Sequence, residues 1–323
     1  MRVQWMLTMA AVAAVAAMAV AQGSKRLNPV AELLAQKQAV FGLYAPSNRR
    51  APGSGATADA AKSPAQLARE ALGYPGGDFV FDGSLEGNYE AAFPTFAEFA
   101  AGMADGGALA RKPTLRLHHP LFVKTPEIAP DPAKARERIA RQLNQGVAGI
   151  VFVGVESAEE ARQGLAMMRF ESNGGTRPND VGDAPARWGM SEKEYRARAD
   201  LWPLNPRGEL VNWTIVESKE GLAHVREIAA VQGIGVLFPG AGTLRGVFSH
   251  TDANGKRVVD EAAWETAIQQ VLSACKEFQV PCGYPATEKD IEMRMKQGFS
   301  VFIMGWGAPG ERTIEIGRKL AGR

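Results

Sequence analysis

Several ionisable residues lie at or beside the ends of apolar runs. Glu217 ends the run "VNWTIVE", and Asp82 ends "DFVFD". Arg116 lies inside "TLRLHHP", with His118 shortly after it. A carboxylate can bind a hard divalent cation or transfer a proton, and a guanidinium can hold a carboxylate through two parallel hydrogen bonds. The pattern indicates a site that binds a carboxylate-bearing ligand beside an acidic group.

The stretch "GIGVLFPGAGTLRGVFS", residues 233–249, contains a glycine loop without any ionisable acid. The apolar run over 234–238 is typical of a buried strand, and it then breaks into glycines. Backbone N–H groups in such a loop can hold an anion. We therefore expect the amides around Gly240 and Gly242 to contribute to substrate binding.

Each ionisable candidate also has a purely structural explanation. Glu217 could cap the helix that follows it, and Asp82 could form a turn with Gly83. Arg116 could run outward between helices with only its charged end in water, and His118 could be an ordinary loop histidine. Strand parity alone does not decide between inward and outward positions, so these alternatives stay open at this point.

The elements that must position these residues alternate between helices and apolar runs. The segment 131–146 opens with Asp131 as a helix N-cap and Pro132 in the first turn. Ser157 is expected to cap the helix over 158–168. Strands that alternate with helices of this length indicate a parallel sheet with helices outside it.

Eight strand candidates at this chain length predict an α/β fold, a (β/α)₈ TIM barrel. Active sites in such barrels lie at the carboxyl ends of the strands, and this rule directs attention to the candidates above. The predicted strands cover residues 40–44, 79–82, 114–117, 149–153, 210–216, 234–238, 281–284 and 300–304.

The charge balance argues against nucleic acid as a partner. The chain has 37 Lys plus Arg against 35 Asp plus Glu, a net charge of +2, and it has no basic stripe interleaved with aromatic residues. The cysteines, Cys275 and Cys282, do not form a disulfide framework. A single bridge between them and a pair of buried free thiols are both compatible with the sequence.

The first residues have the features of a signal peptide. A short positive start precedes an apolar core, and Ala19-Val20-Ala21 forms a small-residue cleavage site before Gln22. The alternative is a membrane anchor, which needs about 20 apolar residues and a polar stop signal. We expect a signal peptide over 1–21, a single barrel domain over 22–323 with an exposed loop at 46–64, and a periplasmic or secreted location without stable membrane insertion.

From Asn28 to its end the chain resembles the HpcH/HpaI aldolase and citrate lyase family, as a divergent, exported member. The most specific segments are "QGVAGIVFVGVESAEEARQGLAMMRF", "WPLNPRGELVNWTIVES" and "GYPATEKDIEMRMKQGFSVFIMG". The resemblance implies a barrel of the phosphoenolpyruvate/pyruvate type that makes or breaks carbon–carbon bonds through an enolate. It also implies a divalent metal such as Mg²⁺ or Mn²⁺, a small keto-acid or hydroxy-acid substrate, and a homo-oligomer.

The same resemblance assigns roles to individual residues. Glu217 matches the metal-binding glutamate that closes the fifth strand, and Arg116 fits the arginine of the third strand. Asp82 fits the family's aspartate after the second strand, but Leu85 falls at the position of the acid–base histidine. Thr243, in the loop that holds the substrate carboxylate, stands where the second metal ligand is an aspartate.

These two departures leave two functions open. The first is a class II, metal-dependent carbon–carbon lyase in which Glu217 holds the ion and Arg116 holds the carboxylate. In that version His118 replaces the lost base. The second is a non-catalytic or metal-independent barrel that binds carboxylates, because Thr243 and Leu85 replace the metal aspartate and the histidine.

The signal-peptide assignment predicts the start of the mature protein. When the full chain is expressed in a Gram-negative host with its own leader, the exported protein should begin at Gln22. Intact mass and amino-terminal sequencing of the periplasmic fraction measure this directly. Recovery only of chains that begin at Met1, in the membrane fraction, would favour the anchor instead.

Overall fold

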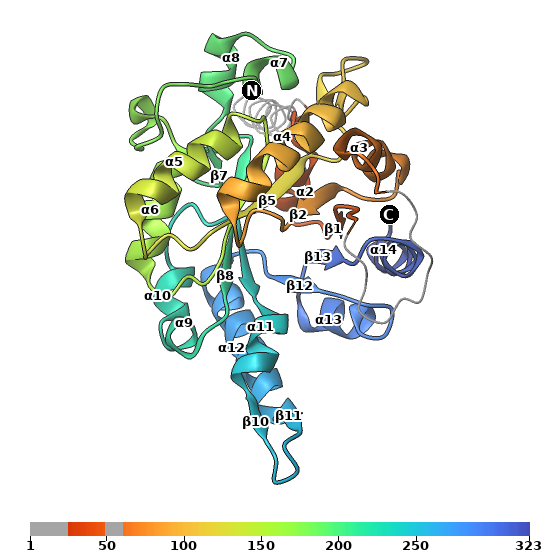
Figure 1. Ribbon diagram of the computed structural model, residues 1–323, viewed down its shortest axis with the longest axis vertical. Coiled ribbons are helices and arrows are strands. Elements are labelled where there is room, and N and C mark those ends of the chain that lie inside the picture. The colour runs from red at the N-terminus through yellow and green to blue at the C-terminus, as the bar shows by residue number, and fades with distance from the viewer. Residues whose placement is uncertain (1–24, 49–60) are drawn as a thin grey trace, which may run out of the picture.

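The computed structural model describes residues 25–48 and 61–323. The predicted signal peptide and most of the 46–64 loop lie outside these ranges. The described chain forms a barrel of parallel strands with helices packed around it, as predicted (Figure 1). Its strands are β1 (Val40–Tyr44), β2 (Phe79–Asp82), β5 (Leu121–Thr125), β6 (Gly149–Phe152), β8 (Leu210–Val216), β9 (Val236–Pro239), β12 (Gly283–Pro285) and β13 (Val301–Met304).

The strands pair in parallel in the order β12, β13, β1, β2, β5, β6, β8, with β9 on the free edge of β8. A parallel bridge between Leu237 of β9 and Cys282, just before β12, closes the ring. Short strand β7 (Leu201–Trp202) pairs with the start of β8. All carboxyl ends of the barrel strands therefore meet at one mouth, where this fold places its chemistry.

Helices follow most strands and begin at the residues that the sequence indicates. Asp131 accepts a hydrogen bond from the Lys134 N–H at the start of α5, and Ser157 accepts one from the Glu160 N–H at the start of α6. Both predicted N-caps are confirmed. The helices are α2 (Pro29–Ala35), α3 (Pro64–Gly73), α4 (Tyr89–Asp105), α5 (Pro132–Leu143), α6 (Ala158–Met168), α7 (Ala184–Arg187), α8 (Glu192–Arg198), α9 (Lys219–Ala223), α10 (Val225–Ala229), α11 (Ala241–Val247), α12 (Glu261–Phe278), α13 (Ile291–Gln297) and α14 (Ala308–Leu320).

One predicted strand is wrong. The third barrel strand is β5 (Leu121–Thr125), which pairs with β2 and β6, and not residues 114–117. That earlier segment contributes only the two-residue strand β4 (Arg116–Leu117), which pairs antiparallel with β3 (Leu109–Ala110). The run "LFVKT" buries more apolar surface than "PTLRL", and this burial decides which segment joins the barrel.

Aromatic rings fill the barrel. The Trp213 ring lies 4.8 Å from Phe122, 5.0 Å from Phe79 and 5.8 Å from Phe81, measured between ring centroids. Glycine at 283 leaves room for this packing, because a Cβ there would lie 2.1 Å from the Phe238 ring. The lumen is therefore a packed core below the mouth and not a channel.

The two cysteines form a bridge. Cys275, in the last turns of α12, is bonded to Cys282, with their Cα atoms 5.7 Å apart. Of the two states that the sequence left open, the structure has the disulfide. The bridge ties the end of α12 to the segment that leads into β12.

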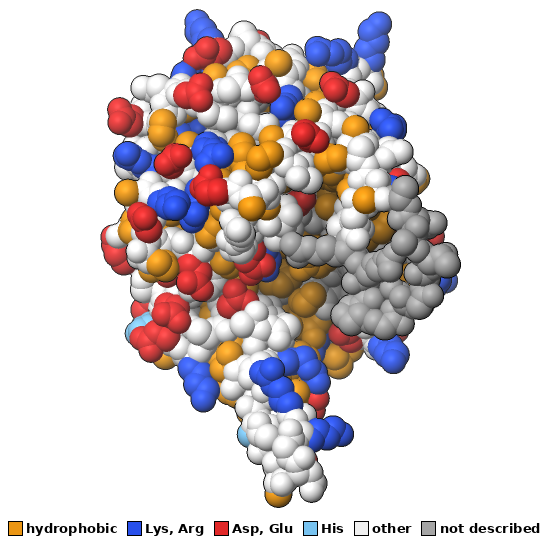
Figure 2. Space-filling view, in the orientation of Figure 1, with side chains coloured by type: hydrophobic (Ala, Val, Ile, Leu, Met, Phe, Trp, Pro, Cys, Tyr) orange, Lys and Arg blue, Asp and Glu red, His pale blue; other side chains and the backbone are white. Residues whose placement is uncertain are grey.

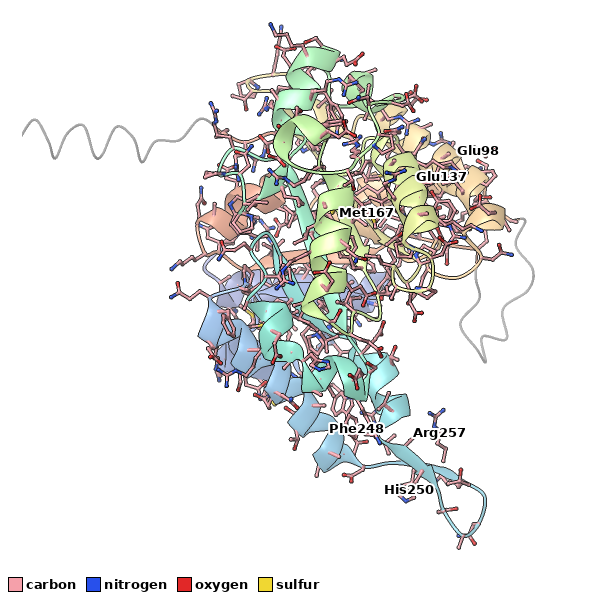
Figure 3. The ribbon with its side chains drawn as sticks, turned by 90° about the vertical axis from the view of Figure 1, so that its left-hand side faces the viewer. Glu98, Glu137, Met167, Phe248, His250 and Arg257 are labelled. Carbon is pink, nitrogen blue, oxygen red and sulfur yellow. A yellow bond between two sulfur atoms is a disulfide. The ribbon has the colours of Figure 1, made fainter. Side chains whose placement is uncertain are left out.

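A hairpin of β10 (Ser249–Thr251) and β11 (Arg257–Val259) projects beyond α11 and α12 (Figures 1 and 3). The Asp252 carboxylate accepts hydrogen bonds from the N–H groups of Asn254 and Lys256 and so forms the turn at its tip. Across the described residues, no helix combines the length and apolar character that a membrane span requires.

The aromatic packing predicts a large effect of truncation at its centre. Trp213→Ala should lower the free energy of unfolding by about 3–5 kcal/mol, because it empties the middle of the barrel. Urea denaturation followed by circular dichroism measures the change. Leu320→Ala, whose side chain is 46% exposed, is the control and should cost far less; equal losses would contradict the central role of Trp213.

Candidate active site

Glu217 faces the lumen at the mouth of the barrel. Successive side chains of a strand alternate between its two faces, so Trp213, inside the barrel, puts the residue at 217 on the same face. The Glu217 Oε1 atom accepts a hydrogen bond of 3.1 Å from the Gly154 N–H. A Cβ at Gly240 would lie 2.4 Å from Glu217 Oε2. The carboxylate is thus held between the ends of β6 and β9.

The cation of the third barrel strand is Lys124. Phe122 packs against Trp213 inside the barrel, so Lys124 shares its inward face. The Lys124 Nζ atom forms an ion pair of 2.8 Å with Glu86 Oε2, and the lysine side chain is only 14% exposed. Lys124 was not among the residues predicted from the sequence, although a single cation inside the apolar run "LFVKT" was a usable signal.

Tyr44, at the end of β1, lies between these charges. A Cβ at Gly83 would lie 3.8 Å from both the Tyr44 ring and the Lys124 side chain. Burial raises the pKa of the Tyr44 phenol; Lys124 opposes this rise, and the carboxylates of Glu86 and Glu217 add to it. Four ionisable side chains from different elements therefore interact at one mouth.

A second carboxylate, that of Glu127 in the loop after β5, approaches Gly154 in the loop after β6. Gly154 has a left-handed backbone with φ of +60°, and a Cβ there would lie 3.0 Å from Glu127 Oε1. Glycine is favoured at 154 by this left-handed backbone. Two glutamates thus lie against Gly154: Glu127 lies beside its Cα atom, and Glu217 accepts a hydrogen bond from its N–H.

At the start of α11 (Ala241–Val247), the amides of Ala241, Gly242 and Thr243 have no intrahelical acceptor. The first intrahelical bond runs from the Leu244 N–H to the Gly240 carbonyl, so the N–H groups of Gly242 and Thr243 precede the ladder. The Gly240 N–H donates to the Val216 carbonyl, which corrects the expectation that it binds substrate. Gly242 and Thr243 are exposed.

Arg116 lies at the opposite end of the barrel. It forms an ion pair with Glu32 of α2, the helix that leads into the start of β1, and donates to the Arg26 carbonyl. The prediction that Arg116 faces the mouth is therefore wrong. It failed because the segment around 116 precedes the third barrel strand instead of forming it.

His118, two residues after Arg116, also lies at the amino end of the barrel. The residue is exposed, and its N–H donates to the Ala108 carbonyl beside the β3–β4 pair. It lies before β5, at the amino end of that strand. The prediction that His118 supplies the acid–base group at the mouth is wrong.

Asp82 and Leu85 lie near the mouth, where Asp82 forms a turn and Leu85 packs in the core. Asp82 Oδ1 accepts a hydrogen bond of 2.7 Å from the Ser84 N–H, which is the turn role weighed above. Because Phe81 faces the lumen, Asp82 lies on the opposite face of β2. Leu85 is fully buried and has no group that could transfer a proton.

The described residues contain no group of three or more His, Cys, Asp or Glu side chains arranged to hold a metal ion. Mg²⁺, however, is commonly held by one or two carboxylates together with waters and substrate oxygens. Glu217, with Glu127 nearby, meets this smaller requirement.

Figure 2 shows that the face above the base of the hairpin is hollowed, with hydrophobic side chains at its floor.

A family model described as HpcH/HpaI aldolase/citrate lyase matches residues 113–308. The chain belongs to this family, whose members are carbon–carbon lyases. A hydroxypyruvate/pyruvate aldolase of Delftia acidovorans is 28% identical over 152 residues, which are 47% of this chain and 52% of that protein. The chain thus matches about half the length of this relative.

Two solved structures share the fold. A family protein of Burkholderia cenocepacia superposes with a TM-score of 0.63 at 19% identity, covering 91% of this chain and 98% of that one. A Mycobacterium tuberculosis protein, solved with magnesium and acetate, has a TM-score of 0.50 at 16% identity, covering 89% and 92%. These similarities establish the barrel architecture.

The mouth geometry makes the titration of Tyr44 depend on Glu217. Glu217→Gln removes a negative charge that disfavours the phenolate, so the pKa of Tyr44 should fall. Absorbance of the phenolate against pH, with Tyr44→Phe to identify the signal, measures it. Glu292→Gln on α13, a surface residue paired with Lys296, should leave the titration unchanged. No shift on Glu217→Gln would contradict the shared mouth.

Proposed function

We propose that this protein is a class II, divalent-metal-dependent lyase that cleaves or forms a carbon–carbon bond in a keto acid or hydroxy acid through an enolate. The observation that carries the proposal is the convergence of Glu217, Lys124 and Tyr44, from three strands, at the carboxyl end of the barrel. Membership of the aldolase/citrate lyase family supports the reaction type. The name of the Delftia relative supports a pyruvate-like substrate.

Lys124 takes the role that the sequence analysis gave to Arg116. Its ammonium, largely withdrawn from water, provides a positive charge for a substrate carboxylate or for the oxygen of the enolate. A charge that is fixed in place before the reaction stabilises the enolate more than water does. The amides of Gly242 and Thr243 offer a second anchor for a carboxylate.

Tyr44 is the group we assign to proton transfer in place of His118. Its phenol can donate a hydrogen bond or a proton to the reacting oxygen, and its raised pKa favours the protonated form. Leu85 leaves the histidine position of the family without a proton-transfer group. A neighbouring phenol on β1 is the group that compensates for this loss.

Glu217, after β8, is the residue that would hold the divalent ion, with Glu127, after β5, as a second acid beside Gly154. A bound divalent ion polarises the substrate carbonyl and stabilises negative charge on its oxygen. Thr243 offers only a neutral oxygen where the family aspartate would be charged, so metal affinity should be weak in the absence of substrate. The magnesium bound to the Mycobacterium neighbour supports this ion type.

A second candidate function is a non-catalytic or metal-independent barrel that binds small carboxylates. The replacement of the aspartate by Thr243 and of the histidine by buried Leu85 favours it, because both changes remove groups that turnover uses. Under either function we propose a homo-oligomer that is exported to the periplasm or secreted.

Calorimetry and kinetics together test the two candidates. With Mn²⁺ and pyruvate present, the wild type should bind the ion and catalyse aldol cleavage of a 4-hydroxy-2-keto acid. Glu217→Gln should abolish Mn²⁺ binding, and Lys124→Gln should lower kcat/KM by about a hundredfold or more. Arg116→Gln is the matched control, because it removes a cation from the other end of the barrel, and should keep near wild-type kinetics.

The outcomes separate the proposals. Binding of pyruvate that needs Lys124 but yields no turnover, with or without metal, would favour the non-catalytic barrel. Loss of activity in Arg116→Gln, with Lys124→Gln unaffected, would overturn the assignment of the mouth. Circular dichroism of each variant confirms that the fold is intact before the comparison.

A further inference from the structure

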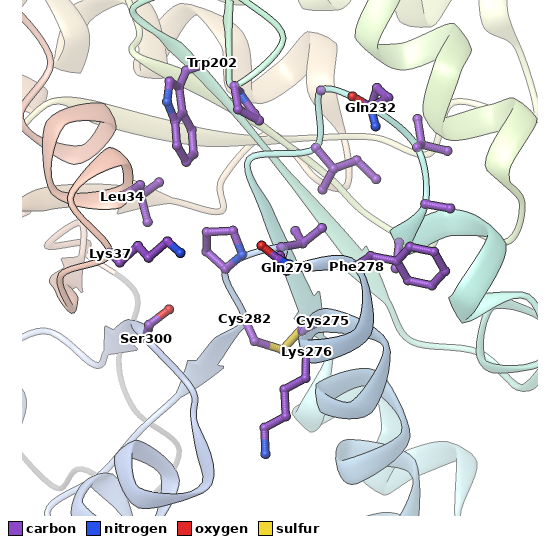
Figure 4. A pocket seen from close by; sticks show the side chains of 18 of the residues that line it. Leu34, Lys37, Trp202, Gln232, Cys275, Lys276, Phe278, Gln279, Cys282 and Ser300 are labelled. Carbon is purple, nitrogen blue, oxygen red and sulfur yellow. A yellow bond between two sulfur atoms is a disulfide. The ribbon is translucent and has the colours of Figure 1, made fainter. Parts of the chain in front are cut away.

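A cavity lies at the amino end of the barrel, away from the mouth. Its volume is about 730 Å³, which is within the range of roughly 300–1,000 Å³ that small-molecule sites occupy. It opens between the end of α2, the end of α12 and the segments that lead into β9, β12 and β13 (Figure 4). The barrel chemistry described above does not use this end.

The wall of the cavity is apolar. Leu34 and Trp202 line one side and Phe278 lines the other (Figure 4). Trp202 is only partly buried and Phe278 is 36% exposed. Aromatic faces left open to solvent in a cavity of this size can pack against the apolar body of a ligand.

The charged side chains that line the cavity are all positive. Lys37 and Lys276 line the cavity, and its lining contains no Asp or Glu. Across residues 25–48 and 61–323, no carboxylate forms a salt bridge with either lysine. Two ammonium groups without acidic partners beside an apolar wall favour an anionic ligand.

The backbone directs two polar side chains of the lining. Lys37 has φ of 55° and Gln279 has φ of 54°, and His119 is the third described non-glycine residue in this left-handed region. Such a conformation is uncommon outside glycine. In Figure 4 the Lys37 and Gln279 side chains both extend toward the middle of the cavity. The turns at the ends of α2 and α12 thus present an ammonium and an amide to the cavity.

The disulfide fixes one wall. Cys275 and Cys282 themselves line the cavity, and so do Lys276, Phe278 and Gln279 in the turn between them. A bridge across this short turn restricts its conformations and so lowers the entropy cost of ordering it around a ligand. The cavity wall is therefore preformed in the oxidised protein.

We propose that this amino-end cavity is a second binding site, which takes a small organic anion with an apolar body. Lys37 attracts the anionic group directly, and Lys276, whose side chain extends away from Lys37 toward Gly298, adds longer-range positive charge. Gln279 donates a hydrogen bond to the anion, and the apolar body packs between Trp202 and Phe278. The site is independent of the lyase proposal, because none of its residues lies at the mouth.

Titration calorimetry with 2-naphthoate, in oxidised full-length protein, tests the site. The double variant Lys37→Gln/Lys276→Gln should weaken binding at least tenfold, and the neutral 2-naphthalenemethanol should bind the wild type at least tenfold more weakly than 2-naphthoate. Decanoate is the second probe and shows whether an alkyl body serves as well as an aromatic one. Lys193→Gln, an exposed lysine on α8, is the matched control and should bind like the wild type.

Two further comparisons locate the bound anion. Reduction of the disulfide, verified by thiol counting, should weaken naphthoate binding, and Glu217→Gln should leave it unchanged. The proposal is overturned if the wild type does not bind either probe, if the double variant binds both like the wild type, or if the neutral analogue binds as tightly as naphthoate. A failure of the lyase test affects none of these readings.

Discussion

The packing of Trp213 against the phenylalanine rings inside the barrel is the constraint on which the site depends. It fixes which face of each strand looks inward, and the strict alternation of a strand carries that choice to the strand end. The inward direction of the Glu217 side chain follows from that of Trp213 on β8, and the inward direction of Lys124 follows from that of Phe122 on β5. The carboxylate of Glu217 and the ammonium of Lys124 are therefore positioned by hydrophobic packing within their own strands.

Most of the architecture could be predicted from the sequence because its signals are local. The N-caps at Asp131 and Ser157 lie where their side chains accept the expected hydrogen bonds, and the apolar run before Glu217 is a fully buried strand. The third strand was misplaced because "TLRL" and "LFVKT" are neighbouring apolar runs of similar length. Which of them pairs with β2 and β6 is decided by the whole barrel, and no local pattern records it.

The same shift explains why the candidate site was only half predicted. Placing the strand early moved Arg116 and His118 to the mouth and hid Lys124. Tyr44 was missed for a different reason: a tyrosine at a strand end is usually a packing residue. Its raised pKa comes first from burial, and then from the carboxylates of Glu86 and Glu217, which distant segments contribute. Leu85 and Thr243 stand where the resemblance to the family predicts a histidine and an aspartate, and we propose that Tyr44 and Glu127 take over their roles.

The central claim is that Lys124, Tyr44 and Glu217 surround one ligand. A crystal structure of the protein soaked with Mn²⁺ and oxalate, a mimic of the pyruvate enolate, tests it most directly, since the anomalous signal of manganese locates the ion independently of the protein. The account predicts manganese bound to the Glu217 carboxylate, with oxalate within hydrogen-bond distance of Lys124 Nζ and of the Tyr44 hydroxyl. Manganese or oxalate bound elsewhere, with the mouth holding only water, would contradict it.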